Sequence, residues 1–283
     1  KWDRVDYLKP LPPVVEGMLR DYQKEGISWL NFLYEQGFHG LLADDMGLGK
    51  TLQVLSFLHQ VSDKQWHLVV LPSSLLFQWE KEANKYFPDI NIWKYYGIDR
   101  VLPEDGEGGI VLTTYQLLQR DYEKLASKTF HCICLDEAQK IKNPRSKTFL
   151  AAKSLQGRFR LSITGTPIEN HLTDLWSQMH FLMPKVFDKQ IFQDISLGGA
   201  SQEILDFVRR KVDPFVLRRE KKEVAKELPE LLHQDVWLEF SNEEQKCYDY
   251  LLSKKRGELL NKIKSQGFSK NRHEIFELIL RLR

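Results

Sequence analysis

The sequence lacks the features that would point to a membrane protein or to a disulfide-bonded scaffold. No apolar run approaches the roughly 18 residues that a membrane-spanning helix needs. The three cysteines are few and odd in number, which argues against a disulfide framework and for a reducing compartment. The eight histidines show no metal-ligand spacing and no HExxH motif, so we interpret them as structural residues.

The sequence also lacks a strong excess of one charge, internal repeats and the pattern of a signal peptide. Lys and Arg (41) barely outnumber Asp and Glu (39), and a net charge of +2 does not by itself predict nucleic-acid binding. The chain begins with Lys1 and stops at Arg283 within a run of apolar and charged residues, so we expect an excised piece. Its 283 residues predict one large or two modest globular domains.

Short apolar runs alternate with amphipathic stretches through the first 180 residues. The apolar runs are 40–43, 68–71, 110–113, 132–135 and 161–164, and each is typical of a strand buried on both faces. Helix-like stretches lie between them at 51–60, 74–87, 115–127 and 146–155. This alternation predicts an α/β fold whose parallel sheet is covered on both faces and binds ligands at the carboxyl ends of its strands. Cys132 and Cys134 alternate along one strand, which favours core packing over a metal site.

The residue pattern of the sequence changes beyond about residue 180. Strand signals become sparse, and long helical patterns occupy 201–212 and the chain from 242 onward. We therefore expect two domains, an α/β lobe over residues 1–182 and a mainly helical extension over residues 183–283. Basic residues between 209 and 226 form a strip that could bind phosphates or could be the solvated face of charged helices. Trp29, Trp79 and Trp176 lie on apolar helix faces, which favours core packing over base stacking.

The most specific motif is DDMGLGKT at residues 44–51, which follows a predicted strand and opens a predicted helix. Glycines let backbone N–H groups converge on a β-phosphate, and the helix N-terminus adds the positive end of its dipole. Lys50 would then neutralise β- and γ-phosphate oxygens, and the Thr51 hydroxyl would help to coordinate magnesium. Asp44 replaces the first glycine of the eight-residue pattern, so the flanking strand and helix have to support the assignment. A plain strand-to-helix turn is the alternative.

An acidic pair ends another predicted strand, HCICLDE. Asp136, at the carboxyl end of a buried strand, could hold magnesium, and Glu137 would be placed to activate water as a general base. An acidic first turn of a helix is the alternative interpretation. Thr164, Gly165 and Thr166 follow the next strand, where small hydroxyl residues suit a sensor of the nucleotide state.

In this order and spacing, the three motifs resemble helicase superfamily two, and more narrowly its SWI/SNF-related ATPases, which translocate on double-stranded DNA. The resemblance extends over nearly the whole chain. It includes LRDYQKEG (19–26), ADDMGLGKTLQ (43–53), LPSSL (71–75), LTTY (112–115), DEAQ (136–139), TGTPIEN (164–170) and FVLRR (215–219). Asp45 stands where most members have Glu. DEAQ in place of the commoner DEAH, together with TGTPIEN, favours a bacterial or archaeal member.

The resemblance implies a RecA-like P-loop NTPase lobe with a helical protrusion, ATP and magnesium as cofactors, and a second RecA-like lobe beyond residue 283. It also implies that Gln23 reads the adenine edge. The expected nucleotide-binding residues are Arg20, Gln23, Asp45, Met46, Gly47, Leu48, Gly49, Lys50, Thr51 and Leu52, with Lys50, Asp136 and Glu137 catalytic and Thr51 and Asp136 at the metal. The expected contacts with nucleic acid are Ser73, Thr113, Thr114, Tyr115, Lys140 and Lys142, and the expected coupling residues are Gln139, Thr164, Gly165 and Thr166.

Together these features predict the ATP-binding lobe of a DNA-dependent ATPase that moves along double-stranded DNA and remodels or displaces DNA-bound protein. Contacts with the DNA backbone would make binding independent of sequence. Because the family's second lobe supplies arginines to the γ-phosphate, we expect this chain alone to hydrolyse ATP slowly. An RNA or strand-separating helicase of the same superfamily, a nucleotide-gated interaction module and a P-loop kinase are the alternatives. The expected location is the cytoplasm or nucleoid of a prokaryote, or the nucleus of a eukaryote.

Overall fold

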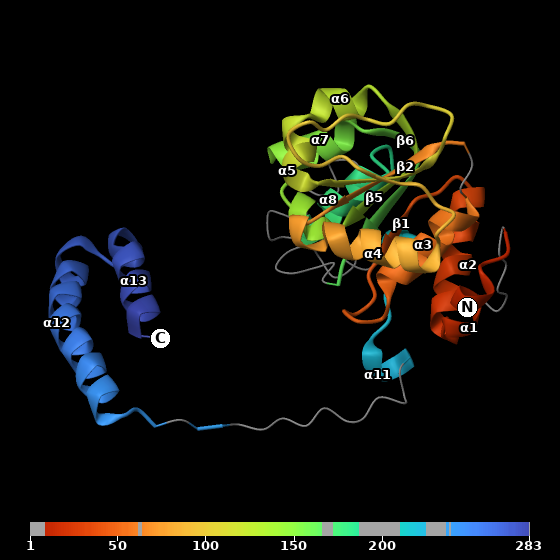
Figure 1. Cartoon of the computed structure of the whole chain (residues 1–283). Helices are drawn as coiled ribbons and strands as arrows, with labels where there is room; N and C mark the ends of the chain where they lie inside the picture. The colour runs from red at the N-terminus through yellow and green to blue at the C-terminus, as the bar shows by residue number, and fades with distance from the viewer. Residues whose placement is uncertain are drawn as a thin grey trace. The chain divides into compact units, whose positions relative to one another are not determined.

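The computed structural model describes residues 9–61, 64–165, 172–186, 210–224, 236–237 and 239–282. The chain divides into two units, Lys1–Leu228 and Pro229–Arg283 (Figure 1). Within the described ranges, the first unit holds the sheet and the second consists of helices. None of the helices in these ranges is both long enough and apolar enough to cross a membrane.

A seven-stranded sheet organises the first unit, and its paired strands all run parallel. The strand order is β3-β4-β2-β5-β6-β1-β7, which places β1 between β6 and β7. The strands are β1 (Gly40–Leu42), β2 (Trp66–Leu71), β3 (Ile92–Lys94), β4 (Gly109–Thr114), β5 (Thr129–Asp136), β6 (Gln156–Ile163) and β7 (Val216–Leu217). The predicted α/β fold with a parallel sheet is confirmed.

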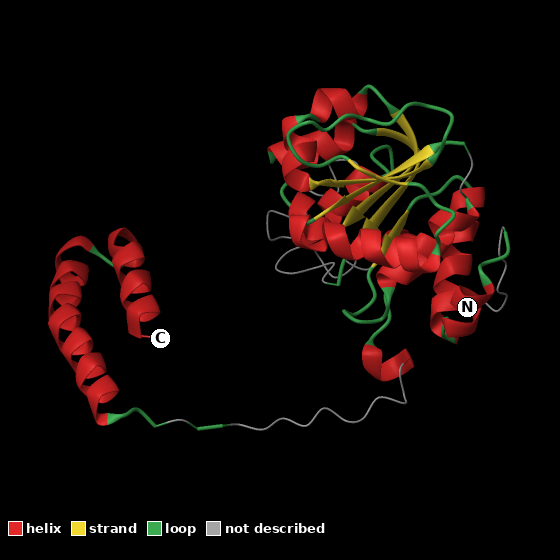
Figure 2. Ribbon diagram, viewed as in Figure 1, coloured by secondary structure: helices red, strands yellow, loops and turns green. Residues whose placement is uncertain are grey.

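Helices cover both faces of this sheet (Figure 2). One buried cluster holds apolar side chains of α2, α3 and α4, and the other holds those of α5, α7 and α8. Along β5, Cys132 and Cys134 enter the first cluster while Ile133 and Leu135 enter the second, as the two-residue period of a strand requires. This confirms that the two cysteines pack on one face. The helices of the unit are α1 (Pro13–Met18), α2 (Asp21–Glu35), α3 (Lys50–Gln60), α4 (Leu76–Tyr86), α5 (Tyr115–Arg120), α6 (Tyr122–Ala126), α7 (Lys147–Ser154), α8 (Leu172–Leu182) and α11 (Lys221–Val224).

The predicted helices agree with the structure except where local hydrogen bonds interrupt them. The predicted helix over 115–127 is divided into α5 and α6 at Asp121. Asp121 has non-helical φ and ψ angles of −113° and 30°, and its carboxylate accepts hydrogen bonds from Arg100 Nε (2.6 Å) and the Tyr95 hydroxyl (3.1 Å). The predicted helix over 74–87 begins as a 3₁₀ turn, Ser73–Leu75, before α4. The predicted helix over 201–212 lies outside the described residues, apart from 210–212.

Two edge strands, β3 and β7, are absent from the predicted set. They have three and two residues, and their side chains are at most partly buried, so neither shows the long apolar run of an interior strand. β7 comes from the part of the sequence expected to be the helical extension. It pairs with β1, placing Leu41 beside Val216 and Leu42 beside Leu217. This pairing brings the residues that follow β7 next to the loop that follows β1.

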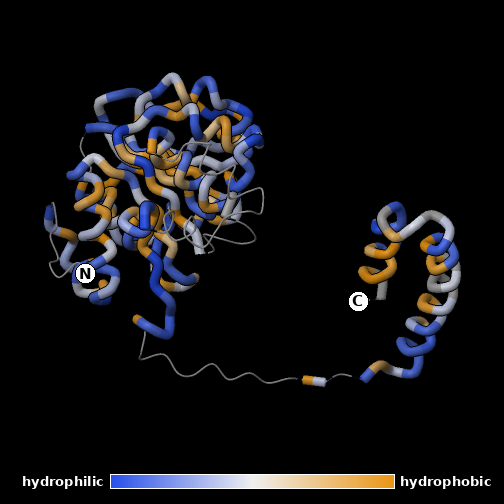
Figure 3. The backbone as a smooth tube through the Cα atoms, turned by 180° about the vertical axis from the view of Figure 1, so that it is seen from behind, coloured by the Kyte–Doolittle hydropathy of each residue, from blue (hydrophilic) through white to orange (hydrophobic). Residues whose placement is uncertain are grey.

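The second unit contains α12 (Asn242–Gln266), a 3₁₀ turn (Ser269–Asn271) and α13 (Arg272–Leu282), which confirms the helical pattern predicted from residue 242 onward. A capping box starts α12, since Glu244 N–H donates to the Ser241 hydroxyl (3.3 Å) and Ser241 N–H donates to the Glu244 carboxylate (2.8 Å). Lys262 of α12 forms an ion pair with Glu274 of α13 (2.8 Å). Along the backbone tube, hydrophobic residues concentrate in the interior of the first unit and recur in the helices of the second (Figure 3).

Candidate nucleotide-binding site

Three neighbouring strands bring the expected nucleotide-site residues to one edge of the sheet. β1 leads into the loop that begins at Asp44, β5 ends at Asp136, and β6 is followed by Thr164. Because β1 and β5 both pair in parallel with β6, their carboxyl ends meet at the same edge. This edge is where open α/β sheets bind ligands. The fold therefore brings together three motifs that are far apart in the sequence.

The loop between β1 and α3 has the backbone geometry of a phosphate-binding turn. Gly47 and Gly49 have φ angles of 85° and 73°, in the left-handed region that favours glycine. A Cβ atom on Gly49 would lie 2.4 Å from the Gln23 side-chain nitrogen, so a larger residue would displace Gln23 as well as strain the backbone. α3 begins at Lys50, and the first N–H groups of a helix lack partners within the helix. The loop thus offers both a tight turn and a helix N-terminus to an anion.

The Lys50 side chain folds back along the loop and lies in the electrostatic field of the acidic pair. Its ammonium donates hydrogen bonds to the backbone oxygens of Asp44 (2.6 Å) and Asp45 (3.1 Å). Burial lowers the pKa of Lys50, and the carboxylates of Asp44 and of Glu137 and Asp136 act in the opposite direction. The structure therefore places the loop lysine and the two acids in one site.

The acidic pair is held in place by its neighbours. Asp136 accepts hydrogen bonds from Trp79 Nε1 (2.8 Å) and from the Glu137 backbone N–H (2.9 Å). Burial raises the pKa of Asp136 to about 6; the negative charge of Glu137 adds to this, while the Trp79 hydrogen bond opposes it. The Tyr115 hydroxyl donates to the Asp136 backbone oxygen (2.7 Å). The Asp136 carboxylate is thus held in place by the fold, and both acids lie near enough to Lys50 to affect its pKa.

Glu137 adopts a conformation that is unusual for a residue with a side chain. Its φ is 51° and its ψ is 52°, and it is the only non-glycine residue with a positive φ in the described ranges. Such a backbone costs about 1–3 kcal/mol and persists where surrounding contacts impose it, often at functional sites. The side chain of this residue accepts a hydrogen bond from the Gln139 amide (2.6 Å), which fixes the direction of the Glu137 carboxylate.

The expected coupling residues connect the acidic pair to the end of β6. The Thr164 hydroxyl donates to Gln139 Oε1 (2.9 Å), and Gln139 donates onward to Glu137. A Cβ atom on Gly165 would lie 2.9 Å from Met46 Cγ and 3.8 Å from Lys50 Nζ. Gln139, Thr164 and Gly165 thus form a bridge between the general-base candidate and the phosphate loop. Thr166 lies outside the described residues.

The expected adenine-reading segment rests against the phosphate loop. The Gln23 amide donates to the Leu48 backbone oxygen (3.1 Å), and its carbonyl accepts from the Arg20 N–H (2.9 Å). Arg20 and Met46 are exposed, and Leu52 is half-buried on α3. The segment therefore borders the loop, while adenine recognition by Gln23 stays a prediction.

The expected DNA-contacting residues lie at the same edge of the sheet but differ in exposure. Ser73 and Lys140 are exposed, whereas Lys142 is half-buried. The hydroxyl of Thr113 donates to the Tyr95 backbone oxygen (3.1 Å), and that of Thr114 caps α5 by accepting from the Leu117 N–H (3.3 Å). The Tyr115 hydroxyl is bonded within the acidic site, as described above. Three of the six expected residues thus have hydroxyls engaged inside the fold, and their role in DNA binding stays a prediction.

Three further residues of the site do not appear among the expected ones. Arg219 pairs with the buried Asp44 carboxylate, and Gln53 hydrogen-bonds to both. Trp79 was assigned to the core from its apolar helix face, and it is indeed buried, but its indole N–H also orients Asp136. Gln53 and Arg219 each carry a sequence signal, because they stand within the ADDMGLGKTLQ and FVLRR segments, but neither segment indicates that the two residues meet at Asp44.

The residues of the site fit a nucleotide and magnesium. Backbone amides and an ammonium group suit phosphate oxygens, and the Thr51 hydroxyl and Asp136 carboxylate offer the oxygen atoms that magnesium prefers. Within the described ranges, no group of three or more His, Cys, Asp or Glu residues forms a complete metal cage. Magnesium typically binds to one or two carboxylates together with substrate phosphates and water.

The sequence matches the SNF2-related domain over residues 22–283. "Uncharacterized ATP-dependent helicase MG018" of Mycoplasma genitalium is 39% identical over 273 residues, and "Helicase ssl-1" of Caenorhabditis elegans is 36% identical over 269 residues. These matches cover 94% and 87% of this chain but only 26% and 11% of the two relatives. The chain therefore corresponds to a small part of each relative's length.

The fold is also similar to solved structures. The Sulfolobus solfataricus SWI2/SNF2 ATPase core in complex with dsDNA has 33% sequence identity and a TM-score of 0.71, and the match covers 99% of this chain and 59% of that one. The Sulfolobus solfataricus SWI2/SNF2 ATPase core domain gives a TM-score of 0.68 at 34% identity, with 99% and 58% covered. Since the family match, the relatives and the fold agree, the chain belongs to the SNF2-related family.

Proposed function

We propose that this chain is the ATP-binding lobe of a DNA-dependent ATPase that translocates on double-stranded DNA to remodel or displace DNA-bound protein. The observation that supports the proposal most directly is the placement of Lys50 in a glycine-rich loop within the field of Asp136 and Glu137. A loop lysine and two acids at one edge of the sheet are among the parts that ATP hydrolysis uses.

In the proposed reaction, the loop binds the phosphates and the acidic pair acts on water. The N–H groups at the start of α3 would bind the β-phosphate, and Lys50 would exchange its bonds to backbone oxygens for phosphate oxygens. Thr51 and Asp136 would hold magnesium, which would neutralise charge on the phosphate oxygens. Glu137 would accept a proton from the attacking water, with its carboxylate oriented by the Gln139 amide.

The same contacts would link hydrolysis to movement. A change in hydrogen bonding at Glu137 would pass through Gln139 to Thr164, where β6 ends. The chain after Thr164 would then respond to the state of the nucleotide. We propose that closure against a second RecA-like lobe converts this response into a step along the duplex.

DNA would bind beside the nucleotide site, where β2 and β4 end. The exposed Ser73 and Lys140 are the described candidates whose side chains face solvent, and contacts with phosphates would make binding independent of base sequence. The double-stranded DNA bound to the similar Sulfolobus solfataricus ATPase core supports this choice of substrate.

Stimulation of ATP turnover by different nucleic acids tests the proposal. Turnover of the intact protein containing this chain would be measured with duplex DNA, single-stranded DNA and RNA of equal length. We expect duplex DNA to give the largest increase. A larger increase with RNA or single-stranded DNA would favour an RNA or strand-separating helicase, and an absence of turnover would favour a nucleotide-gated interaction module.

A further inference from the structure

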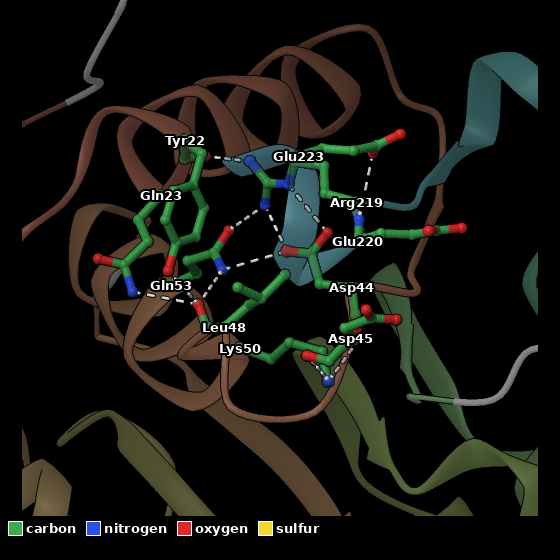
Figure 4. Close-up of polar contacts among 10 residues, drawn as sticks. All are labelled: Tyr22, Gln23, Asp44, Asp45, Leu48, Lys50, Gln53, Arg219, Glu220 and Glu223. Atoms are coloured by element: carbon green, nitrogen blue, oxygen red, sulfur yellow. Dashed lines mark hydrogen bonds and ion pairs between the residues drawn. The ribbon is translucent and has the colours of Figure 1, made fainter. Parts of the chain in front are cut away.

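A second set of polar contacts lies around Asp44, outside the groups that act on ATP in the proposed reaction. Asp44 stands where the eight-residue phosphate-loop pattern begins, and its side chain is fully buried. A buried carboxylate is costly unless it is paired and hydrogen-bonded. Arg219 supplies the partner: its Nε donates to one Asp44 oxygen (2.9 Å), and a second guanidinium nitrogen donates to the other (Figure 4). This bidentate geometry is the strong form of an arginine–carboxylate pair.

The same guanidinium connects the helices on both sides of the loop. It donates to the Tyr22 backbone oxygen in α2 and to the Gln53 side-chain oxygen in α3 (2.8 Å). Gln53 in turn donates to Asp44 (3.3 Å) and to the Leu48 backbone oxygen at the tip of the loop (3.3 Å). Arg219 therefore reaches the start of the loop directly, at Asp44, and reaches Leu48 through Gln53, although it lies outside the loop itself.

A glycine in α2 leaves room for this cluster. A Cβ atom on Gly26 would lie 2.0 Å from Gln53 Oε1 and 2.9 Å from an Arg219 guanidinium nitrogen. A glycine in a helix interior is unfavourable by roughly 0.5–1 kcal/mol relative to alanine. Here it allows the arginine and the glutamine to reach Asp44.

The backbone around Arg219 reinforces the contact. Ala43 N–H donates to the Leu217 oxygen (2.7 Å), and Asp45 N–H donates to the Arg219 oxygen (3.0 Å). Lys221 N–H donates to the Asp45 carboxylate (3.0 Å). Residues 217–221 therefore run beside residues 43–45 and prolong the pairing of β7 with β1. The start of the phosphate loop is held by this segment through both backbone and side chains.

We propose that Arg219 is a positioning residue that fixes the phosphate loop in its nucleotide-binding conformation. The proposal rests on the function proposed above. A loop whose amides are already oriented binds phosphate without having to become ordered at that moment, which increases affinity. Arg219 does not belong to the phosphate-binding surface, and it would act through Asp44 and Gln53.

Two substitutions at Arg219 and one double variant separate positioning from folding. Arg219→Lys keeps the charge but loses the bidentate hydrogen bonding to Asp44. Arg219→Gln leaves Asp44 without a cationic partner. Asp44→Asn combined with Arg219→Gln removes both charges, so no buried charge is left unpaired. Arg120→Lys, at an exposed arginine of α5, is the matched control.

The measurements are thermal unfolding without nucleotide, binding of a fluorescent ATP analogue without DNA, and ATP turnover by the intact protein. For Arg219→Lys we expect about tenfold weaker analogue binding and about a tenfold higher KM, with kcat changed less than about twofold, because binding is lost equally in the ground and transition states. The double variant should melt at a higher temperature than Arg219→Gln while binding the analogue no better. Arg120→Lys should match the wild type in all three measurements.

Contrary results have distinct meanings. If the wild-type protein does not hydrolyse ATP, the proposed function fails. If it does, and Arg219→Lys melts at a lower temperature with unchanged KM and analogue affinity, the pair is only structural and the inference is overturned. If all three variants fail to fold, the inference is also overturned. The same holds if the double variant regains both its stability and its affinity for the ATP analogue.

Discussion

At the scale of single residues, the proposed reaction gives Glu137 a role in catalysis and no role in nucleotide binding. Replacing Glu137 with Gln removes the proton acceptor but keeps the side-chain size, so nucleotide affinity should change little. Loss of a general base lowers rates by about 10²–10⁴-fold, and we expect kcat to fall within that range. Turnover and analogue binding by the intact protein check the prediction.

The control for this variant is an exposed carboxylate that lies away from the site. Glu123→Gln on α6 also changes a glutamate to a glutamine, but its partner is the neighbouring exposed Tyr122 (2.9 Å). It should leave kcat unchanged. A Glu137→Gln protein with near wild-type turnover would show that another group activates the water.

A second residue-scale prediction concerns His67, which is buried in β2. Neither of its ring nitrogens has a hydrogen-bond partner within the described residues, and burial, helped by the nearby His131, lowers its pKa to about 3. The folded state therefore keeps His67 neutral, whereas the unfolded chain takes up a proton below pH 6.5. Its contribution to stability is complete above pH 6.5 and declines as the pH falls. The loss should reach about 2 kcal/mol between pH 7 and pH 5.

Denaturant unfolding at several pH values checks this prediction. His67→Leu removes the titrating group, so the free energy of unfolding of that variant should depend less on pH between 7 and 5. The control is His273→Gln, at an exposed histidine, which should keep the wild-type pH dependence. An unchanged slope in His67→Leu would assign the pH dependence to other groups.

At the scale of secondary-structure elements, the long interior strands could be predicted from the sequence, whereas the edges of the sheet could not. β2, β4, β5 and β6 have six or eight residues, and each contains an apolar run of buried side chains that marks it clearly. β3 and β7 have only three and two residues and no buried side chain, unlike the equally short β1, whose three residues are all buried. Their existence depends on partners far along the chain. The local sequence pattern therefore predicts the central strands of the sheet better than its edge strands.

One element-scale prediction concerns the start of α7. The Ser146 hydroxyl accepts a hydrogen bond from the Phe149 N–H (3.1 Å), which satisfies one of the free donors of the first turn. Ser146→Ala should lower the free energy of unfolding by about 1 kcal/mol. Ser146→Asn keeps an acceptor at the cap and should cost less. Equal losses in the two variants, measured by denaturant unfolding, would contradict the capping role.

At the scale of the whole molecule, the motifs predicted which residues would meet, but not every contact among them. The order of the loop, the acidic pair and the Thr164 segment placed them at one sheet edge, because parallel strands share a carboxyl edge. The contact between Arg219 and Asp44 could not be predicted, since the two residues are 175 positions apart and Arg219 stands in a strip of basic residues. Only the β1–β7 pairing brings the two together.

The last prediction concerns the arginine that phosphoryl transfer requires at the γ-phosphate. Among the residues that the structure describes, Arg219 binds directly to the phosphate loop, but its guanidinium is buried and bonded to Asp44 and Gln53, so it is not free to move to the phosphate. If a second lobe supplies the missing arginine, the isolated chain should hydrolyse ATP about 10³–10⁵-fold more slowly than the intact protein. Turnover of both at saturating ATP, with and without duplex DNA, checks this. A comparable rate in the isolated chain that rises with duplex would mean that the chain already holds all the groups the reaction needs.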